Sequence, residues 1–542
     1  MLTVSNVSVA FNGKKLYDDV NVKFTAGNTY GVIGANGAGK STFLKVLEGK
    51  LSPTTGSVSI STGERMSSLN QDHFAFDDYT VLDTVIQGHK HLYEVMKEKD
   101  AIYLKDPFTD EDGLRAGELE GEFAEMGGWE AESDASQLLQ QIGMPEDMHY
   151  KMMSELTESE KVKVLLAQAL FGEPDILVLD EPTNGLDTHT VDWLEGFLAD
   201  YPNIAIIVSH DRHFLNAVAT MMLDVDFGKI KMFVGNYDFW KQSSELAAKL
   251  QSNANAKKEE KIKELQEFVA RFSANASKAK QATSRQKQLE KITLDDIQPS
   301  TRKYPWIKFE ALRELGNDLL RVDNVSKTID GVKILDNITF IVKPGEKAAL
   351  LSRSDVATTT LMEILAGKME PDSGTVTWGV TTNRSYMSKD LNENFDDPKA
   401  TIIDWLRQFA SKEESDNTFL RGMLGRMLFS GDDVTKEINV LSGGEKVRVM
   451  LSKLMLLKTN VLVMDDPTNH LDLESITSLN EGMIDYKGSI IFASHDREFI
   501  QTIADHIIEV TANGVVERAE TTYDEFVENK DIQKQIDELY AK

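Results

Sequence analysis

The sequence predicts an α/β fold that the chain contains twice, and three observations lead to this prediction. Residues 34–41 fit the pattern G-x-x-x-x-G-K-[ST], between an apolar, β-favouring run and a segment with helical spacing. Residues 176–179 form an apolar run that ends in two carboxylates, as a buried parallel strand would. Short motifs of the first half then recur in the second half. Because glycine-rich loops between a strand and a helix hold phosphates, we expect a nucleotide site in the first copy.

The composition limits the class of protein. A chain of 542 residues is too long for one core and is expected to form two to four domains. No run approaches ~18 uncharged apolar residues, so we expect no membrane span, no signal peptide and a cytoplasmic location. The absence of cysteine excludes disulfides, thiolate zinc sites and iron–sulfur clusters. A net charge of -29 argues against nucleic acid as a partner, unless charge is segregated along the chain.

The loop at residues 34–41 predicts how its residues meet a nucleotide. Backbone amides of the glycine-rich segment would cradle the phosphates, Lys40 would reach the terminal phosphates, and the Ser41 hydroxyl would ligate Mg²⁺. The residues expected to bind nucleotide here are Gly34, Ala35, Asn36, Gly37, Ala38, Gly39, Lys40, Ser41 and Thr42.

The carboxylates that follow residues 176–179 would lie at the carboxyl edge of a parallel sheet, where open α/β sheets bind ligands. We expect Asp180 to hold Mg²⁺ through water, and Glu181 to orient and polarise the attacking water in phosphoryl transfer. His210 follows the apolar run 204–208 and is expected to contact the γ-phosphate. Gln71 is expected to ligate or sense Mg²⁺. The predicted catalytic residues are thus Glu181 and His210, and the predicted metal ligands are Ser41, Gln71 and Asp180.

The repeat contains an insertion. Early motifs recur 318 residues later, as Val4 and Val322 do, whereas late motifs recur 285 residues later, as Asp180 and Asp465 do. The first copy therefore carries about 33 extra residues, which we assign to residues 89–133. From Lys97 to Asp134 there are 13 acidic and 4 basic residues on helix-forming sequence. This segment is predicted to be an acidic helical arm, either a solvated charged face or a surface for a partner.

A basic helical linker is predicted between the copies. Residues 245–292 lack proline and glycine, and residues 268–289 carry five basic and no acidic residues. The candidates for RNA contact are Arg271, Lys278, Lys280, Arg285 and Lys287. Small polar residues and two phenylalanines lie between them, which favours contact with a phosphate backbone over simple charge balance.

These motifs resemble the ATP-binding cassette superfamily of P-loop NTPases. In that family two cassettes face head to tail and hold ATP between the phosphate loop of one and the Leu-Ser-Gly-Gly-Glu signature of the other. The second copy has this signature at residues 441–445. The resemblance implies that Ser442, Gly443, Gly444 and Glu445 bind the nucleotide, and that Phe11 stacks on the adenine. It also implies ATP and Mg²⁺ as cofactors, and an ATPase that is a monomer with intramolecular cassette pairing.

The other pair of motifs has diverged. In the first copy the signature position reads Leu-Thr-Glu-Ser-Glu at residues 156–160, without glycine. In the second copy the phosphate loop lacks its lysine, Asp355 replaces Gly37, and Asp466 replaces Glu181. We therefore expect one competent site and one degenerate site, which either binds nucleotide weakly or serves only as an interface. Residues assigned to the degenerate site are Ser354, Thr358, Thr359, Asp465, Asp466, His495 and Thr157.

Two fused cassettes with a basic linker and an arm resemble the ABC-F family of ribosome-associated ATPases, and the sequence at residues 268–278 resembles its YbiT-type subgroup. The resemblance implies binding in the exit site of the ribosome. The linker would then contact rRNA and the peptidyl or initiator tRNA, and the arm would contact the L1 stalk. The expected domains are a first cassette at residues 1–241, a linker at 242–305 and a second cassette at 306–542.

Two other classes of cassette protein compete with this interpretation. A fused ATPase subunit of a membrane importer also often has one degenerate site, but it needs neither the arm nor the basic linker. A cassette ATPase of DNA repair or chromosome organisation would require zinc-ligand cysteines or very long coiled coils, which this sequence lacks. Whether the protein is a translation factor or an antibiotic-resistance protein stays open.

Overall fold

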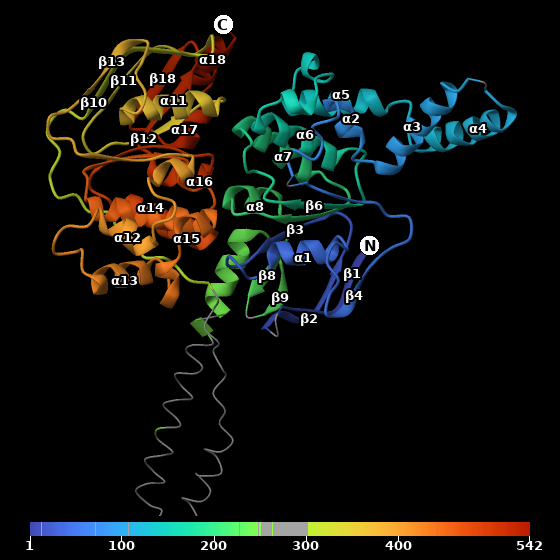
Figure 1. The fold of residues 1–542 in the computed structure, drawn as a ribbon, viewed down its shortest axis with the longest axis horizontal. Helices are drawn as coiled ribbons and strands as arrows, with labels where there is room; N and C mark the ends of the chain where they lie inside the picture. The colour runs from blue at the N-terminus through green and yellow to red at the C-terminus, as the bar shows by residue number, and fades with distance from the viewer. Residues whose placement is uncertain are drawn as a thin grey trace, which may run out of the picture.

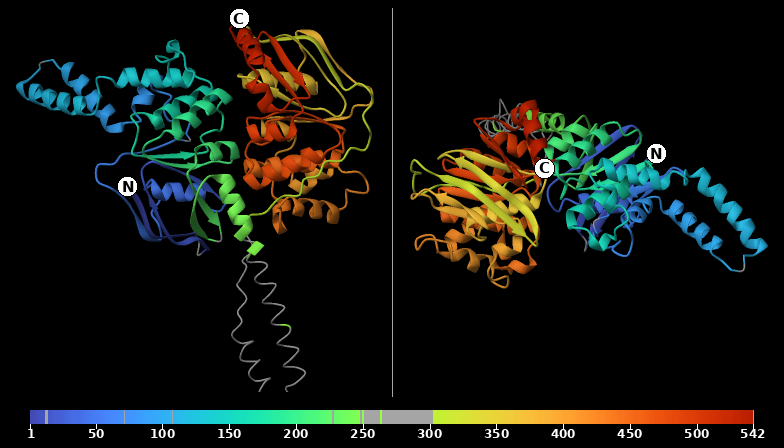
Figure 2. Two further views of the ribbon diagram at one scale, coloured as in Figure 1. Left: turned by 180° about the vertical axis from the view of Figure 1, so that it is seen from behind. Right: turned by 90° about the horizontal axis from the view of Figure 1, so that it is seen from above.

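The computed structural model describes residues 1–11, 14–70, 72–106, 108–226, 228–247, 249–250, 263 and 302–541. Gln71 and the RNA-contact candidates Arg271, Lys278, Lys280, Arg285 and Lys287 lie outside the described residues. The described chain forms two similar halves that lie side by side, with a helical hairpin extending from the N-terminal half (Figure 1). Views from behind and from above show the same separation (Figure 2).

The N-terminal half contains two sheets. An antiparallel sheet has the order β2 (Lys14–Phe24), β1 (Leu2–Phe11) and β4 (Thr55–Ile60). A six-stranded sheet has the order β5 (Met66–Ser68), β6 (Ile176–Asp180), β7 (Ile204–Val208), β3 (Asn28–Ile33), β8 (Met221–Asp226) and β9 (Lys229–Val234). Its strands are parallel apart from β9, which pairs antiparallel with β8.

Helices cover the six-stranded sheet on both faces, as its apolar strands require. On one face α1 (Lys40–Leu47) packs between the two sheets, against Ile176 and Val178. Leu177 and Leu179 face the other side. There the core is closed by α6 (Glu158–Leu170), α7 (Thr188–Ala199) and α8 (Arg212–Val218). Further helices are α2 (Val81–Ile86), α3 (Lys90–Tyr103), α4 (Asp110–Glu125) and α5 (Ala131–Gln141), of which α3 and α4 form the hairpin, and residues 237–247 after β9 are also helical.

The C-terminal half repeats this topology. Its antiparallel sheet has the order β11 (Val332–Val342), β10 (Leu320–Ile329) and β13 (Ser373–Trp378). Its six-stranded sheet has the order β14 (Arg384–Met387), β15 (Val461–Asp465), β16 (Ser489–Ala493), β12 (Lys347–Leu351), β17 (His506–Thr511) and β18 (Gly514–Ala519). The repeated strand order confirms the predicted α/β fold in two copies.

The helices of the C-terminal half include two at its end that the sequence did not predict. The two unpredicted helices are α17 (Tyr523–Glu528) and α18 (Lys530–Tyr540). The helices before them are α11 (Asp355–Ala366), α12 (Ile402–Arg407), α13 (Asn417–Arg426), α14 (Gly443–Leu457), α15 (Leu473–Asp485) and α16 (Arg497–Ile503). The short 3₁₀ segments of the two halves are Glu146–Met148, Met153–Glu155, Leu391–Asn394, Gly431–Thr435 and Ile438–Val440.

Two equivalent arginines join the halves. Arg212 of α8 donates to the carbonyl of Leu473 at 3.2 Å. Arg497 lies 285 residues later, at the start of α16, and its guanidinium is 3.7 Å from Asp192 of α7. Because each arginine contacts the opposite half, the halves face one another head to tail.

A third link involves Arg302, where the described chain resumes. Its buried guanidinium is 2.6 Å from Asp224 of β8 and 2.9 Å from Glu474 of α15, and it lies 4.7 Å from the centre of the Trp240 ring. Carboxylates of both halves thus meet one cation, which fixes the halves in register.

Candidate nucleotide site

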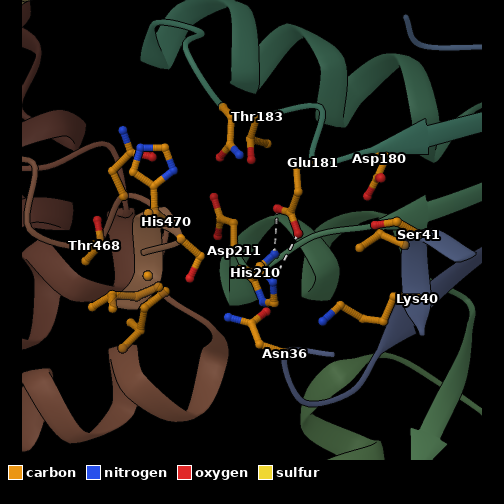
Figure 3. Close-up of a pocket in the computed structure, with 18 of the residues that line it drawn as sticks. Asn36, Lys40, Ser41, Asp180, Glu181, Thr183, His210, Asp211, Thr468 and His470 are labelled. Carbon is orange, nitrogen blue, oxygen red and sulfur yellow. Dashed lines mark hydrogen bonds and ion pairs between the residues drawn. The ribbon is translucent and has the colours of Figure 1, made fainter. Parts of the chain in front are cut away.

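A cavity of about 810 Å³ lies between the two halves. One wall comes from the glycine-rich loop and the strand ends of the N-terminal half, the other from Ser442, Gly443 and Gly444 of the C-terminal half. Figure 3 shows Lys40, Ser41 and Glu181 on one side, and Thr468 and His470 on the opposite side. The volume falls within the range of about 300–1,000 Å³ that small-molecule sites occupy. Of the residues predicted for nucleotide, those that line the cavity are Phe11, Asn36, Gly37, Gly39, Lys40, Ser41, Thr42, Ser442, Gly443 and Gly444.

The glycine-rich loop turns into α1 at Gly39, whose φ of +103° is unfavourable for any residue with a side chain. This turn places Lys40 inside the loop, where its Nζ donates to the carbonyl oxygen of Gly34 at 2.7 Å. Burial lowers the pKa of Lys40, and the nearby carboxylates of Glu181 and Glu474 oppose that shift. Gly34, Ala35 and Ala38 belong to the same turn but do not line the cavity, and the amide of Ala38 donates to the carbonyl oxygen of Ala35 at 3.0 Å.

Glu181, which follows β6, and His210, which follows β7, contact one another. The backbone amide of His210 donates to Oε2 of Glu181 at 3.1 Å, and His210 Nε2 is 3.3 Å from Oε1. Burial raises the pKa of Glu181 to about 8 and lowers that of His210 to about 3. Burial thus favours the uncharged form of both side chains, the carboxyl and the imidazole.

Two features of this pair indicate a ligand site. Glu181 has a φ of +53°, a conformation that costs a residue with a side chain about 1–3 kcal/mol. The buried Nδ1 of His210 has no hydrogen-bond partner within the described part of the chain, which is costly unless a ligand satisfies it. Strain and unsatisfied polar atoms of this kind are typical of functional sites.

The predicted Mg²⁺ ligands Ser41 and Asp180 both line the cavity. Among the described residues, no group of three or more histidine, aspartate or glutamate side chains could hold a metal ion by itself. Mg²⁺ at a phosphate site needs only one or two protein oxygens, because water and phosphate supply the rest. The donors therefore fit Mg²⁺ in the presence of a nucleotide.

The signature of the C-terminal half begins α14. Gly444 lies so close to the loop after β15 that an added Cβ would be 2.8 Å from the carbonyl oxygen of His470. The same Cβ would be 3.8 Å from Nδ2 of Asn36 in the other half. Glu445 does not line the cavity. Its carboxylate instead accepts from the backbone amide of Ser442 at 2.9 Å and caps the helix.

Comparisons with known proteins place this site in a family. A sequence profile described as ABC transporter matches residues 17–184 and 335–469, and another with the same description matches residues 223–309. The ABC transporter ATP-binding protein YkpA of Bacillus subtilis (strain 168) is 61% identical over 542 residues, which cover 100% of both chains. The probable ATP-binding protein YbiT of Escherichia coli O157:H7 is 46% identical over 533 residues, which cover 98% of this chain and 100% of YbiT. The chain belongs to the ABC-F family, in its YbiT-type subgroup.

A solved structure shares the fold of this ABC-F protein. It is the crystal structure of the complex of archaeal ribosomal stalk protein aP1 and archaeal ribosome recycling factor aABCE1, with a TM-score of 0.60 and 15% identity. The likeness covers 96% of this chain and 90% of that chain. This likeness supports the tandem-cassette fold, and the matching profile and the relative YkpA identify the ABC-F protein as an ATPase. No helix in the described part of the chain is long and apolar enough to cross a membrane.

A second, smaller cavity of about 220 Å³ lies at the diverged phosphate loop of this ABC-F protein. Thr358, Asp465, Asp466 and His495 line it, as the sequence grouped them. Burial raises the pKa of Asp465 to about 6. The other members of the predicted group do not line this cavity: Ser354 is the N-cap of α11, Thr359 donates to Asp465 at 2.8 Å, and Thr157 is the N-cap of α6.

Some residues of the two cavities were not predicted. Thr183, Asn184, Asp211 and His470 line the first cavity, and Tyr523 lines the second. For the first group a signal existed, because residues 180–187 and 465–472 are repeated motifs. A signal for the C-terminal helices existed as well, since Thr522 and Glu525 form a capping-box pattern and Ile532, Ile536 and Leu539 recur at helical spacing.

Proposed function

We propose that this ABC-F ATPase acts in the cytoplasm on the ribosome. In this proposal it binds at the exit site with its cassettes closed on ATP and Mg²⁺, and hydrolysis releases it. The linker contacts rRNA and the peptidyl or initiator tRNA, and the arm contacts the L1 stalk. The observation that carries the proposal is the helical hairpin α3–α4, which projects away from both cassettes (Figure 1). An ATPase subunit that couples to membrane proteins needs no such arm.

Contacts between α3 and α4 stabilise the arm where it projects from the cassette. Leu119 and Phe123 of α4 are buried in a cluster that includes residues of α3. Arg115 of α4 donates from Nε to Glu98 of α3 at 2.9 Å. A hairpin whose two helices share buried apolar residues and an ion pair can present a fixed surface to a partner.

The surface of the arm suggests what it touches. Helix α4 carries seven acidic residues and one basic residue. Such a face repels the phosphates of RNA and attracts cationic side chains. Exposed apolar side chains, Leu104 and Leu114, lie on the same hairpin. We therefore assign the arm to a basic protein surface on the stalk, and leave contact with RNA to the linker.

Hydrolysis is assigned to the cavity between the first phosphate loop and the second signature. Lys40 would exchange the carbonyl of Gly34 for the terminal phosphates of ATP, and the amides of Gly443 and Gly444 would meet the γ-phosphate from the opposite cassette. Ser41 and Asp180 would hold Mg²⁺, which neutralises charge on the phosphates. Glu181 would orient the attacking water, and His210 would use its unsatisfied Nδ1 or its Nε2 on the γ-phosphate.

The test is co-sedimentation of the Glu181→Gln protein with ribosomes through a sucrose cushion, with ATP, ADP or no nucleotide. We expect binding that requires ATP. Since each phosphate neutralised contributes about 0.9 to the salt slope on duplex nucleic acid, a salt series reports the linker contacts. The matched variant carries alanine at Lys278, Lys280, Arg285 and Lys287, and we expect weaker binding with a flatter slope. Absence of binding under every condition would contradict the proposal and favour the importer subunit.

A further inference from the structure

Asp355 lies in the second cavity, at the position where the first phosphate loop has Gly37. Its Oδ2 accepts from Nζ of Lys389 at 2.9 Å, and its Oδ1 is 3.1 Å from Nε2 of His495. Lys389 and His495 are the counterparts of Gln71 and His210, the residues expected to meet Mg²⁺ and the γ-phosphate in the first site. Because Lys389 is a cation where the first site has a metal contact, it would face the phosphates of a nucleotide as His495 would, and a carboxylate of the chain occupies both side chains instead.

The negative charge of Asp355 in this cluster is already balanced by the positive charges beside it. Burial opposes ionisation of Asp355, but His495 and Lys389 outweigh it and hold the pKa of that carboxyl well below its usual range. Lys389 is also 3.6 Å from Asp466, so its charge is shared between two carboxylates. A nucleotide would have to bring further negative charge beside Asp355 and Asp466, without the lysine that the loop has lost.

The C-terminal helix covers the backbone of the same loop. The amide of Arg353 donates to the hydroxyl of Tyr540 at 2.7 Å, and that hydroxyl donates to Glu509 at 2.8 Å. The guanidinium of Arg353 lies 4.3 Å from the centre of the Tyr540 ring and 2.7 Å from Asp537. The amide of Arg353, the counterpart of Ala35 in the first loop, is therefore taken by α18.

The residues expected to hold the metal are also joined to each other. Thr359 is the counterpart of Ser41, and its hydroxyl donates to Asp465, the counterpart of Asp180, at 2.8 Å. The cavity of about 220 Å³ is below the usual range for small-molecule sites, whereas the first cavity of about 810 Å³ is within it.

We propose that the second site is liganded by the chain itself, with Asp355 in place of phosphate on Lys389 and His495 and with Tyr540 on the loop amide. The protein then binds one nucleotide per chain, in the first site only. The second half of the cassette interface stays assembled without nucleotide, and one ATP is sufficient for closure. This inference does not depend on the ribosome as partner.

The first test counts nucleotides. Native mass spectrometry of the Glu181→Gln protein with Mg-ATP should give one nucleotide per chain at saturation. Lys40→Ala is the matched control, and should reduce that number toward zero. Two nucleotides per chain in the Glu181→Gln protein would overturn the inference, and this measurement involves no change in the second site.

The second test uses inorganic phosphate as the probe. Asp355→Ala removes the carboxylate that Lys389 and His495 share, so phosphate should raise the melting temperature of this variant by several degrees more than that of the parent, at equal ionic strength. The double variant Asp355→Ala, Lys389→Ala should lose the extra stabilisation. Asp355→Asn serves if the alanine variant does not fold. Equal responses of parent and variant to phosphate would contradict a phosphate-like role of Asp355.

Discussion

The two nucleotide sites share a scaffold and differ in their chemistry. Glu181 and Asp466 both follow a buried strand, with φ values of +53° and +50°. Each donates its amide to the neighbouring strand, at 2.8 Å to Val208 and at 2.9 Å to Ala493. The fold has therefore kept the strained turn in both cassettes. What has changed is the charge around it: Lys40 faces an open cavity in one site, and Lys389 is held by Asp355 in the other.

The largest expected effect comes from the residues at these strained turns. Glu181→Gln removes the group that we propose orients the attacking water, and should reduce ATP turnover by roughly 10²-fold or more. Asp466→Asn should change turnover by less than about twofold, because Asp466, which lines both cavities, is 3.6 Å from Lys389 in the site that we propose takes no nucleotide. Steady-state phosphate release measures both. Equal losses would show that both sites hydrolyse ATP.

The next effect concerns affinity. Lys40→Ala should weaken ATP binding by roughly 10- to 100-fold, since a hydrogen bond to a charged group contributes about 1.5–3 kcal/mol. Thr358→Ala alters the equivalent position of the second loop and should leave ATP affinity unchanged. Isothermal titration with Mg-ATP gives both values. A loss of affinity in the Thr358 variant would indicate that nucleotide enters the second site.

The signature glycine allows a sharper comparison within one cassette. Gly444→Ala places a Cβ 2.8 Å from the carbonyl oxygen of His470 and must displace that loop from the first cavity. We expect turnover to fall about tenfold, with unchanged stability within about 1 kcal/mol. Gly425→Ala is the control, because nothing lies within 4 Å of the added Cβ. Similar turnover in the two variants would exclude close approach of the signature as a requirement.

Much of this comparison could be predicted from the sequence. The repeat predicts two similar folds, because the same apolar runs and turn residues recur in the same order, 318 residues later before the insertion and 285 residues later after it. The first phosphate loop and the second signature are continuous motifs, so their residues could be named. The partners of Asp355 could not, because Lys389 and His495 are brought to it by separate strands of the sheet. Tyr540 lies 187 residues from Arg353, and only the packing of α18 brings them together.

The ionisation of Glu181 provides the smallest and most specific test of the first site. Its pKa is raised from 4.5 to about 8 by burial, so between these values the folded protein keeps a proton that the unfolded chain loses. Stability must then fall as pH rises through this window, by at most about 1.4 kcal/mol per pH unit. Glutamine has no such proton.

In the absence of nucleotide, the melting temperature of Glu181→Gln should therefore exceed that of the parent by a margin that grows from pH 5 to pH 8 and then levels. A constant difference across this range would mean that Glu181 ionises as it does in the unfolded chain.

His210 should make stability depend on pH in the opposite direction, because burial lowers its pKa from 6.5 to about 3. Its contribution to stability is complete above pH 6.5 and is lost on acidification, so His210→Gln should change the profile on the acidic side. Opposite pH windows for two side chains 3.3 Å apart would establish that both are buried at the site as described.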